Sequence, residues 1–110
     1  EIKHTVSSAN SLETEFFCDE KFQGYDDRVH GGVIATLMDS AMTNRLFAAG
    51  IAAVTGELKI RYLKPVWPTR KVTIQARIAS HKSPLFILEA KMYQNGILAC
   101  RAHARFMKIN

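Results

Sequence analysis

The tripeptide His30-Gly31-Gly32 has the composition of a site for a developing negative charge. It lies where a polar loop gives way to an apolar segment of helical periodicity. The first N–H groups of a helix have no partner within the helix and carry the positive end of its dipole. Glycines let a ligand oxygen approach these groups closely, as the stabilisation of an oxyanion requires. The same glycines could serve only the tight entry into the helix, and the tripeptide alone does not decide between the two.

Asp39 is the only charged residue between positions 33 and 44. Burying a lone carboxylate in an apolar helix costs several kcal/mol unless it is paired or neutralised. At about 100° per residue it lies away from the main apolar stripe, on a face of small residues that includes Ala35, Thr36 and Thr43. Such a face leaves room for a ligand or for a second chain. Asp39 is therefore a candidate catalytic carboxylate, and a structural aspartate bonded to nearby backbone is the alternative.

His30 and Asp39 are nine positions apart, which corresponds to about 13 Å along a helix axis. They are too far apart to act on one carbonyl within a single subunit. If both are catalytic, the site must be built across a two-fold interface, with His30 of one chain facing Asp39 of the other. The catalytic hypothesis therefore predicts a homodimer.

Hydrophobic periodicity predicts one helix and five strands that would position these residues. Residues 12–18 alternate as a first strand, and a loop follows as far as Val29. From residue 32 to about 49 apolar residues recur at three- and four-residue steps with so few polar residues that the helix should be buried on most sides. A period of two then returns in four segments, which are residues 57–62, 72–78, 86–92 and 98–106. We expect these four strands to form a meander that curls around the single helix.

The composition limits the class of protein. The 110 residues, 47% of them apolar, predict a single domain spanning residues 1–110, small enough that oligomerisation would usefully bury more surface. No run of about eighteen apolar residues occurs and the first ten residues lack a signal-peptide pattern, so we expect a cytoplasmic protein without a membrane segment. The net charge is +5, but Lys and Arg occur singly along the strands, without the clustering typical of nucleic-acid binding. Two distant cysteines and four scattered histidines have no metal-ligand spacing, so we expect neither a disulfide nor a metal.

Two segments of the chain resemble the phenylacetyl-CoA-type hotdog thioesterases. They are residues 22–42, which contain the His-Gly-Gly motif and Asp39, and residues 55–65, Thr-Gly-Glu-Leu-Lys-Ile-Arg-Tyr-Leu-Lys-Pro. The resemblance covers residues 12–107, approximately. It implies an α+β hotdog fold, with one long central helix wrapped by a curved antiparallel sheet of about five strands, assembled as a dimer or a dimer of dimers. It also implies hydrolysis of an acyl-CoA thioester, with coenzyme A entering only as part of the substrate and no separate cofactor.

The resemblance implies roles for four residues. Asp39 matches the family's catalytic carboxylate, which acts as general base or as nucleophile. Gly31 matches the glycine whose backbone N–H polarises the thioester carbonyl, and His30 matches the histidine that supports this polarisation or orients the loop. Thr55 matches a Ser or Thr on the following strand that helps position the attacking water.

One position departs from the family pattern. Relatives often carry an asparagine about six residues before the motif histidine, near the thioester carbonyl, and this chain has Gly24 there. The neighbouring amide of Gln23 is the candidate replacement. The other candidate substrate-binding residues are a glycine at the helix entry, polar residues near strand ends that would bind the nucleotide, and a methionine that would contact the acyl group. With Gln23, the full set is Gln23, Gly32, Arg61, Lys64, Lys82, Ser83 and Met42.

Two other functions remain to be weighed against hydrolysis. A hotdog protein could hold acyl-CoA or another acyl ligand without turning it over, but such a binder does not require the combination of His30, Gly31 and Asp39. A hotdog dehydratase would need an acidic residue and a histidine in a different arrangement, which the sequence does not show. The identity of the acyl group depends on the shape of the pocket.

Overall fold

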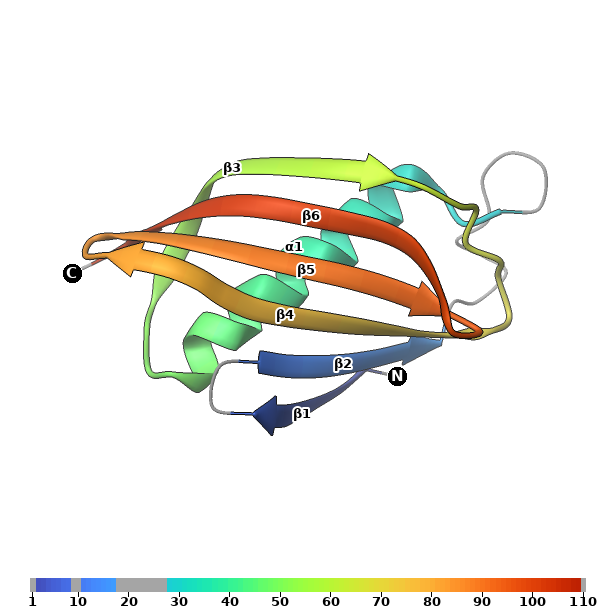
Figure 1. The fold of residues 1–110 in the computed structure, drawn as a ribbon, viewed down its shortest axis with the longest axis horizontal. Coiled ribbons are helices and arrows are strands. Elements are labelled where there is room, and N and C mark those ends of the chain that lie inside the picture. The colour runs from blue at the N-terminus through green and yellow to red at the C-terminus, as the bar shows by residue number, and fades with distance from the viewer. Residues whose placement is uncertain (1, 9–10, 18–27, 110) are drawn as a thin grey trace.

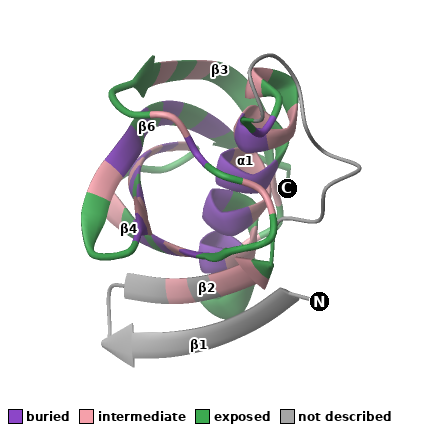
Figure 2. Cartoon of the chain, turned by 90° about the vertical axis from the view of Figure 1, so that its right-hand side faces the viewer, coloured by how far each residue is buried: buried purple, intermediate pink, exposed green. Residues whose placement is uncertain are grey.

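The computed structural model describes residues 2–8, 11–17 and 28–109, and for residues 2–8, 11, 12 and 14 it describes the backbone alone. The elements are β1 (Ile2–Ser8), β2 (Ser11–Phe17), α1 (Gly31–Ala48), β3 (Ala53–Tyr62), β4 (Lys71–Lys82), β5 (Leu85–Gln94) and β6 (Ile97–Lys108) (Figure 1). The strands form one antiparallel sheet in the order β1-β2-β4-β5-β6-β3. The sheet curves around one side of α1 (Figure 2).

This architecture confirms the expected fold class and corrects two details. A further strand, β1, precedes the expected first strand and pairs with it. The last four strands are not a simple meander, because β3 pairs with β6 and not with β4. Residues 63–70 carry the chain across to the far side of β5 and β6, and Pro65 and Pro68 in that connection cannot donate to a ladder. As a result β3 forms one edge of the sheet.

The core lies between one stripe of α1 and the inner face of the sheet. The buried helix residues recur at three- and four-residue steps, as the sequence predicts: Ile34, Leu37, Met38, Ala41, Met42, Arg45 and Leu46. Opposite them, Ala76, Ala90 and Ala102 stand in register on β4, β5 and β6. Small side chains in one row let the helix approach the middle of the sheet closely, and the larger residues of the neighbouring rows fill the space on either side.

The opposite side of α1 is open in the single chain. Gly32, Thr36 and Thr43 are exposed, Asp39 is half-buried, and Phe47 is 73% exposed. The expectation that the helix is buried on most sides is therefore wrong for one chain, because the sheet covers only one stripe of it. Small and polar residues make up much of this open face, which lies on the side of the helix that Asp39 occupies.

Candidate active site

The N-terminus of α1 uses all but one of its first N–H groups. His30 is the N-cap, with an extended backbone (φ −61°, ψ 136°), and its Nδ1 accepts a hydrogen bond from the Gly32 N–H at 2.9 Å. The N–H groups of Val33 and Ile34 both donate to the His30 carbonyl, at 3.0 and 3.2 Å. Within the described part of the chain, the Gly31 N–H has no acceptor. It is therefore the donor that the helix N-terminus can offer to a ligand oxygen.

Tyr62, at the end of β3, holds the same turn from the other side. Its hydroxyl donates to the Gly31 carbonyl at 2.9 Å. That carbonyl and the Gly32 N–H belong to one peptide unit, so His30 and Tyr62 fix the unit at both ends. Burial, and to a smaller degree the nearby Cys100, raise the pKa of Tyr62 above its ordinary 10.0, so the hydroxyl is a donor throughout the neutral range. Donors held in this way need no rearrangement when charge develops beside them.

Sequence reasoning did not identify Tyr62 as a site residue. Tyr62 belongs to the segment that carries the family resemblance, and that membership is the one feature of the sequence that could have identified it. Its contact joins positions 31 residues apart, and only the register of β3 beside the helix reveals it.

The carboxylate of Asp39 is held by Thr55. The Thr55 hydroxyl donates to Asp39 Oδ1 at 2.6 Å, a length typical of a charge-assisted hydrogen bond. Thr55 lies near the start of β3, where the pairing with β6 shifts by one residue at Gly56. A bulge of this kind re-aims the neighbouring side chain. The second carboxylate oxygen has no partner among the described residues, so it is available to accept a proton.

The other polar side chains on this part of the helix bond back to the helix itself. Thr36 donates to the Gly32 carbonyl, Thr43 to the Asp39 carbonyl and Asn44 to the Ser40 carbonyl, each at 2.9 Å. None of these three side chains contacts the Asp39 carboxylate. Among the described residues, Thr55 is the side chain that does.

The two halves of the site lie at different ends of β3. Tyr62, at the last position of the strand, contacts Gly31, whereas Thr55, near its start, contacts Asp39. Along the helix, Gly31 and Asp39 are eight residues apart, or about 12 Å. The free N–H and the carboxylate of one chain therefore cannot reach the same carbonyl group.

The remaining candidate residues are distributed around the molecule. Lys64 lines a hollow of about 320 Å³ together with Gly31 and Tyr62, and Gly32 lines another of about 390 Å³ with Phe16 and His30. Lys82, the last residue of β4, and Ser83, in the turn before β5, are exposed beyond the start of β3. Arg61 lies on the outer face of the sheet, Met42 is fully buried in the core, and Gln23 lies outside the described residues.

Other chemistry has little support in the described residues. No group of three His, Cys, Asp or Glu side chains among them is arranged to hold a metal ion, and no helix there is long and apolar enough to cross a membrane. Cys100 is a buried free thiol, and burial raises its pKa to about 11. It is therefore protonated and inert at neutral pH. Cys18 lies outside the described residues.

Comparison with known proteins gives one family and one fold. The family model described as "Thioesterase superfamily" matches residues 27–100. A curated relative, the 3-hydroxyacyl-(acyl-carrier-protein) dehydratase FabZ of Nitratidesulfovibrio vulgaris, is 33% identical over 73 residues, which are 66% of this chain and 44% of that protein. The chain thus spans less than half the length of this relative.

Many solved structures share this fold, and two of them illustrate it. A hypothetical thioesterase from Streptococcus pneumoniae, crystallised with coenzyme A, has a TM-score of 0.94 at 17% identity, over 100% of this chain and 90% of that one. The Escherichia coli PaaI protein, from the phenylacetic acid degradation operon, has a TM-score of 0.92 at 15% identity, over 99% and 80%. At these identities the likeness shows the fold. Mutant structures of the pneumococcal protein carry an aspartate-to-alanine and a threonine-to-alanine change sixteen positions apart.

Proposed function

Because the chain belongs to the thioesterase superfamily, we propose that it hydrolyses an acyl-CoA thioester to the free acid and coenzyme A. The observation that carries this proposal is the hydrogen bond from Thr55 to the half-buried Asp39 carboxylate. It orients a carboxylate whose second oxygen remains available for proton transfer. Support comes from the pneumococcal thioesterase, which was crystallised with coenzyme A and was altered at an aspartate and a threonine with the same separation.

The proposed chemistry uses water and groups of the chain itself. The Gly31 N–H donates to the thioester carbonyl oxygen and stabilises the negative charge that forms there. As general base, Asp39 takes a proton from a water molecule whose oxygen attacks the carbonyl carbon. The C–S bond then breaks, and the proton passes to the departing thiolate. As nucleophile, Asp39 would attack the carbon directly and form a mixed anhydride, while the C–S bond breaks and coenzyme A leaves as the thiolate. Water then hydrolyses the anhydride to the free acid and the Asp39 carboxylate, and the proton released passes to the thiolate.

We propose that each site combines Gly31 of one chain with Asp39 of a second copy. The separation of about 12 Å along one helix supports this arrangement. The edge strand β3 offers a place for the second copy, because it is ten residues long and no described strand pairs with it on the side away from β6. An antiparallel partner there would set two helices side by side, with the N-terminus of each beside the middle of the other.

Two other functions make different predictions. The identity with FabZ favours dehydration of a 3-hydroxyacyl thioester as the second candidate. In this chain, however, the side chain bonded to Asp39 is a threonine and not a histidine, and His30 Nδ1 is occupied by the Gly32 N–H. The third function is binding of an acyl-CoA without turnover.

Release of free coenzyme A thiol from a panel of aromatic, short-chain and medium-chain acyl-CoAs tests the proposal. We expect thiol release from at least one class, and we expect Asp39→Asn to lower the rate by about 10²–10⁴-fold with unchanged circular dichroism and sedimentation. Near-wild-type turnover by Asp39→Asn would contradict the mechanism. Tight binding without thiol release would indicate a binding protein, and formation of an enoyl product from a 3-hydroxyacyl-CoA would indicate a dehydratase.

A further inference from the structure

The outer face of the sheet, turned away from α1, carries three cations in one row across adjacent strands. Arg61 on β3 is in register with Arg101 on β6, and Arg101 is in register with Lys91 on β5. All three side chains are exposed. Neighbouring strands lie about 4.8 Å apart, so the row is about 10 Å long. With Lys59, His103 and Glu89 from the next row, these cations line a hollow of about 530 Å³ on this face.

The positive charge of this row is not compensated by the described residues. Like charges directly opposite each other on a sheet are destabilising, and Arg101 takes part in two such pairs. Glu89, in the next row, is already in a 2.5 Å ion pair with Arg77. Neither Arg61 nor Arg101 nor Lys91 has an ion pair with any carboxylate in the described ranges.

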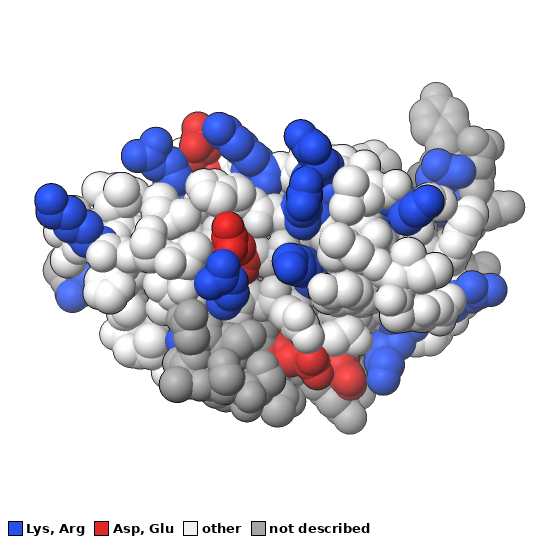
Figure 3. Space-filling view, viewed as in Figure 1, with Lys and Arg blue, Asp and Glu red and all other residues white. Residues whose placement is uncertain are grey.

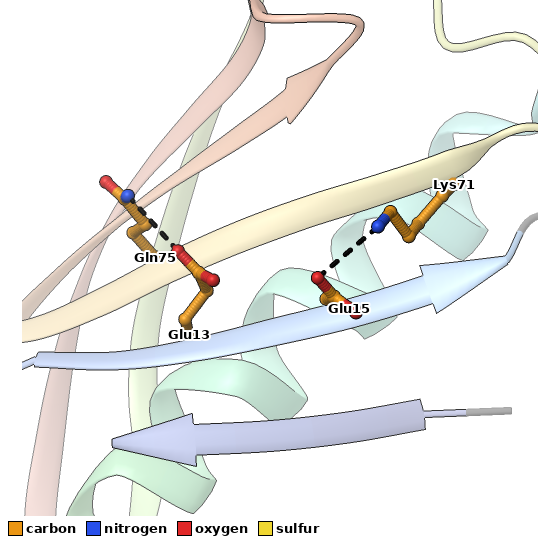
Figure 4. Close-up of polar contacts among 4 residues, drawn as sticks. All are labelled: Glu13, Glu15, Lys71 and Gln75. Carbon is orange, nitrogen blue, oxygen red and sulfur yellow. Dashed lines mark hydrogen bonds and ion pairs between the residues drawn. The ribbon is translucent and has the colours of Figure 1, made fainter. Parts of the chain in front are cut away.

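Carboxylates further along the same face are engaged elsewhere. Beyond Lys91 the row continues with Gln75 on β4, whose amide donates to Glu13 at 3.5 Å, and Lys71 pairs with Glu15 at 3.4 Å (Figure 4). The neutral amide thus separates the row of cations from the acidic strand β2. Strand register fixes the backbone positions of the three cations, so positive charge is concentrated on this part of the face.

The surroundings of the row limit what can occupy it. Figure 3 shows that Lys and Arg side chains gather over the middle of this face and that acidic side chains interrupt and border them. A long polyanion that followed the row would meet Glu13 beyond Gln75. One that followed the strands would meet Glu89 and Glu57 in the next two rows. A second copy of the same face would bring cations against cations. A small, multiply charged anion fits the length of the row, and paired guanidinium groups suit phosphate oxygens.

We propose that Arg61, Arg101 and Lys91 bind the phosphates of a free nucleoside diphosphate or a similar small ligand with two linked phosphates. This site is separate from the proposed active site, because Thr55 and Tyr62 face the helix whereas Arg61 faces the other side of the sheet. The ligand would therefore bind without occupying the position of the thioester. The proposal does not depend on the proposed hydrolysis.

Calorimetric titration with inorganic pyrophosphate and with ADP, at constant ionic strength, tests this site on the whole chain. We expect saturable binding of both, weakened at least about tenfold by Arg101→Gln. The matched control is Arg77→Gln, which removes a cation of the same face that is already paired with Glu89, and it should change the affinity by less than about threefold. Without ligand, Arg101→Gln should raise the thermal midpoint, because two like-charge contacts are lost.

Four results would overturn the proposal. The first is binding of pyrophosphate no stronger than that of chloride, and the second is an equal loss of affinity in Arg77→Gln and Arg101→Gln. The third is binding of coenzyme A without binding of ADP, and the fourth is a changed sedimentation coefficient in Arg101→Gln. The third would make the row part of the substrate site, and the fourth would make it a contact between copies. Thiol release and its loss in Asp39→Asn are measured separately, so either proposal can fail alone.

Discussion

Replacing Thr55 by valine removes the hydroxyl that holds Asp39 while it keeps the shape of the side chain. In the structure this hydroxyl donates to Asp39 Oδ1 at 2.6 Å. A hydrogen bond to a charged group contributes about 1.5–3 kcal/mol. If the bond serves to place the carboxylate, its full value appears in the barrier, and kcat should fall roughly 10- to 150-fold.

The assay is steady-state thiol release from the best acyl-CoA of the panel, with kcat and KM determined separately. The loss should appear in kcat, because the hydroxyl acts on the carboxylate and not on the bound nucleotide. Thr55→Ser restores the hydroxyl and should return kcat to within about threefold of the wild type. Rescue by serine distinguishes the hydrogen bond from a simple loss of packing.

Thr43→Val is the matched control. Thr43 lies one turn further along the same helix and donates to the backbone carbonyl of Asp39, not to its carboxylate. Its loss should change kcat by less than about twofold, since such bonds back to the helix contribute little. Near-wild-type kcat in Thr55→Val, or an equal loss in Thr43→Val, would refute the positioning argument.

Three more predictions concern other described contacts. Tyr62→Phe frees one end of the peptide unit that follows Gly31. In thiol-release kinetics it should lower kcat about three- to tenfold, the equivalent of about 1 kcal/mol. An unchanged kcat would make the contact purely structural. The Cys100 thiol has a pKa raised from 9.0 to about 11, so its contribution to stability is complete below pH 9 and is lost as the pH rises to 11. Measured by urea unfolding, Cys100→Ala should lose less stability than the wild type over this interval, by on the order of 2 kcal/mol. Equal losses in the two proteins would contradict the raised pKa of Cys100. Gln94→Leu removes the buried hydrogen-bond partner of the Trp67 N–H and of the Trp67 and Arg70 carbonyls. In the same urea measurement it should reduce the free energy of unfolding by about 1–3 kcal/mol. An unchanged midpoint would show that water replaces the amide.

The fold was predictable from the sequence where one face of a helix or strand is buried and the other is exposed to solvent. The strands β4, β5 and β6 alternate because each has a core side and an outer side, and the stripe along α1 repeats for the same reason. The order of the strands in the sheet was not predictable in this way. Alternation in β3 indicates that it has a buried face, but it does not identify β6 as its neighbour, and the meander is only the simplest connection.

The candidate site was predictable to a different degree. His30, Gly31 and Asp39 stand out by residue type and position, and Thr55 entered through the family resemblance. What the sequence could not supply is how these groups are held. The Gly32 N–H is taken by His30, and Tyr62 fixes the adjoining carbonyl. Both contacts depend on backbone geometry and on tertiary register.

The central claim is that one site takes its N–H from one chain and its carboxylate from another, and complementation tests it most directly. Gly31→Pro removes the N–H at the first helical position, where proline is tolerated. The preceding residue, His30, already has the extended backbone that proline requires. A β-carbon at Gly31 would meet Tyr62 only at ordinary contact distance, 3.6 Å. Asp39→Asn removes the carboxylate from the other half of the site.

The measurement is thiol release by dimers formed from equal amounts of Gly31→Pro and Asp39→Asn chains. Each variant alone should be nearly inactive. Half of the dimers in a random mixture are mixed, and in each of these one site of two keeps an intact Gly31 N–H and an intact Asp39. The account therefore predicts recovery of about a quarter of wild-type activity. Activity no greater than that of the separate variants would contradict it.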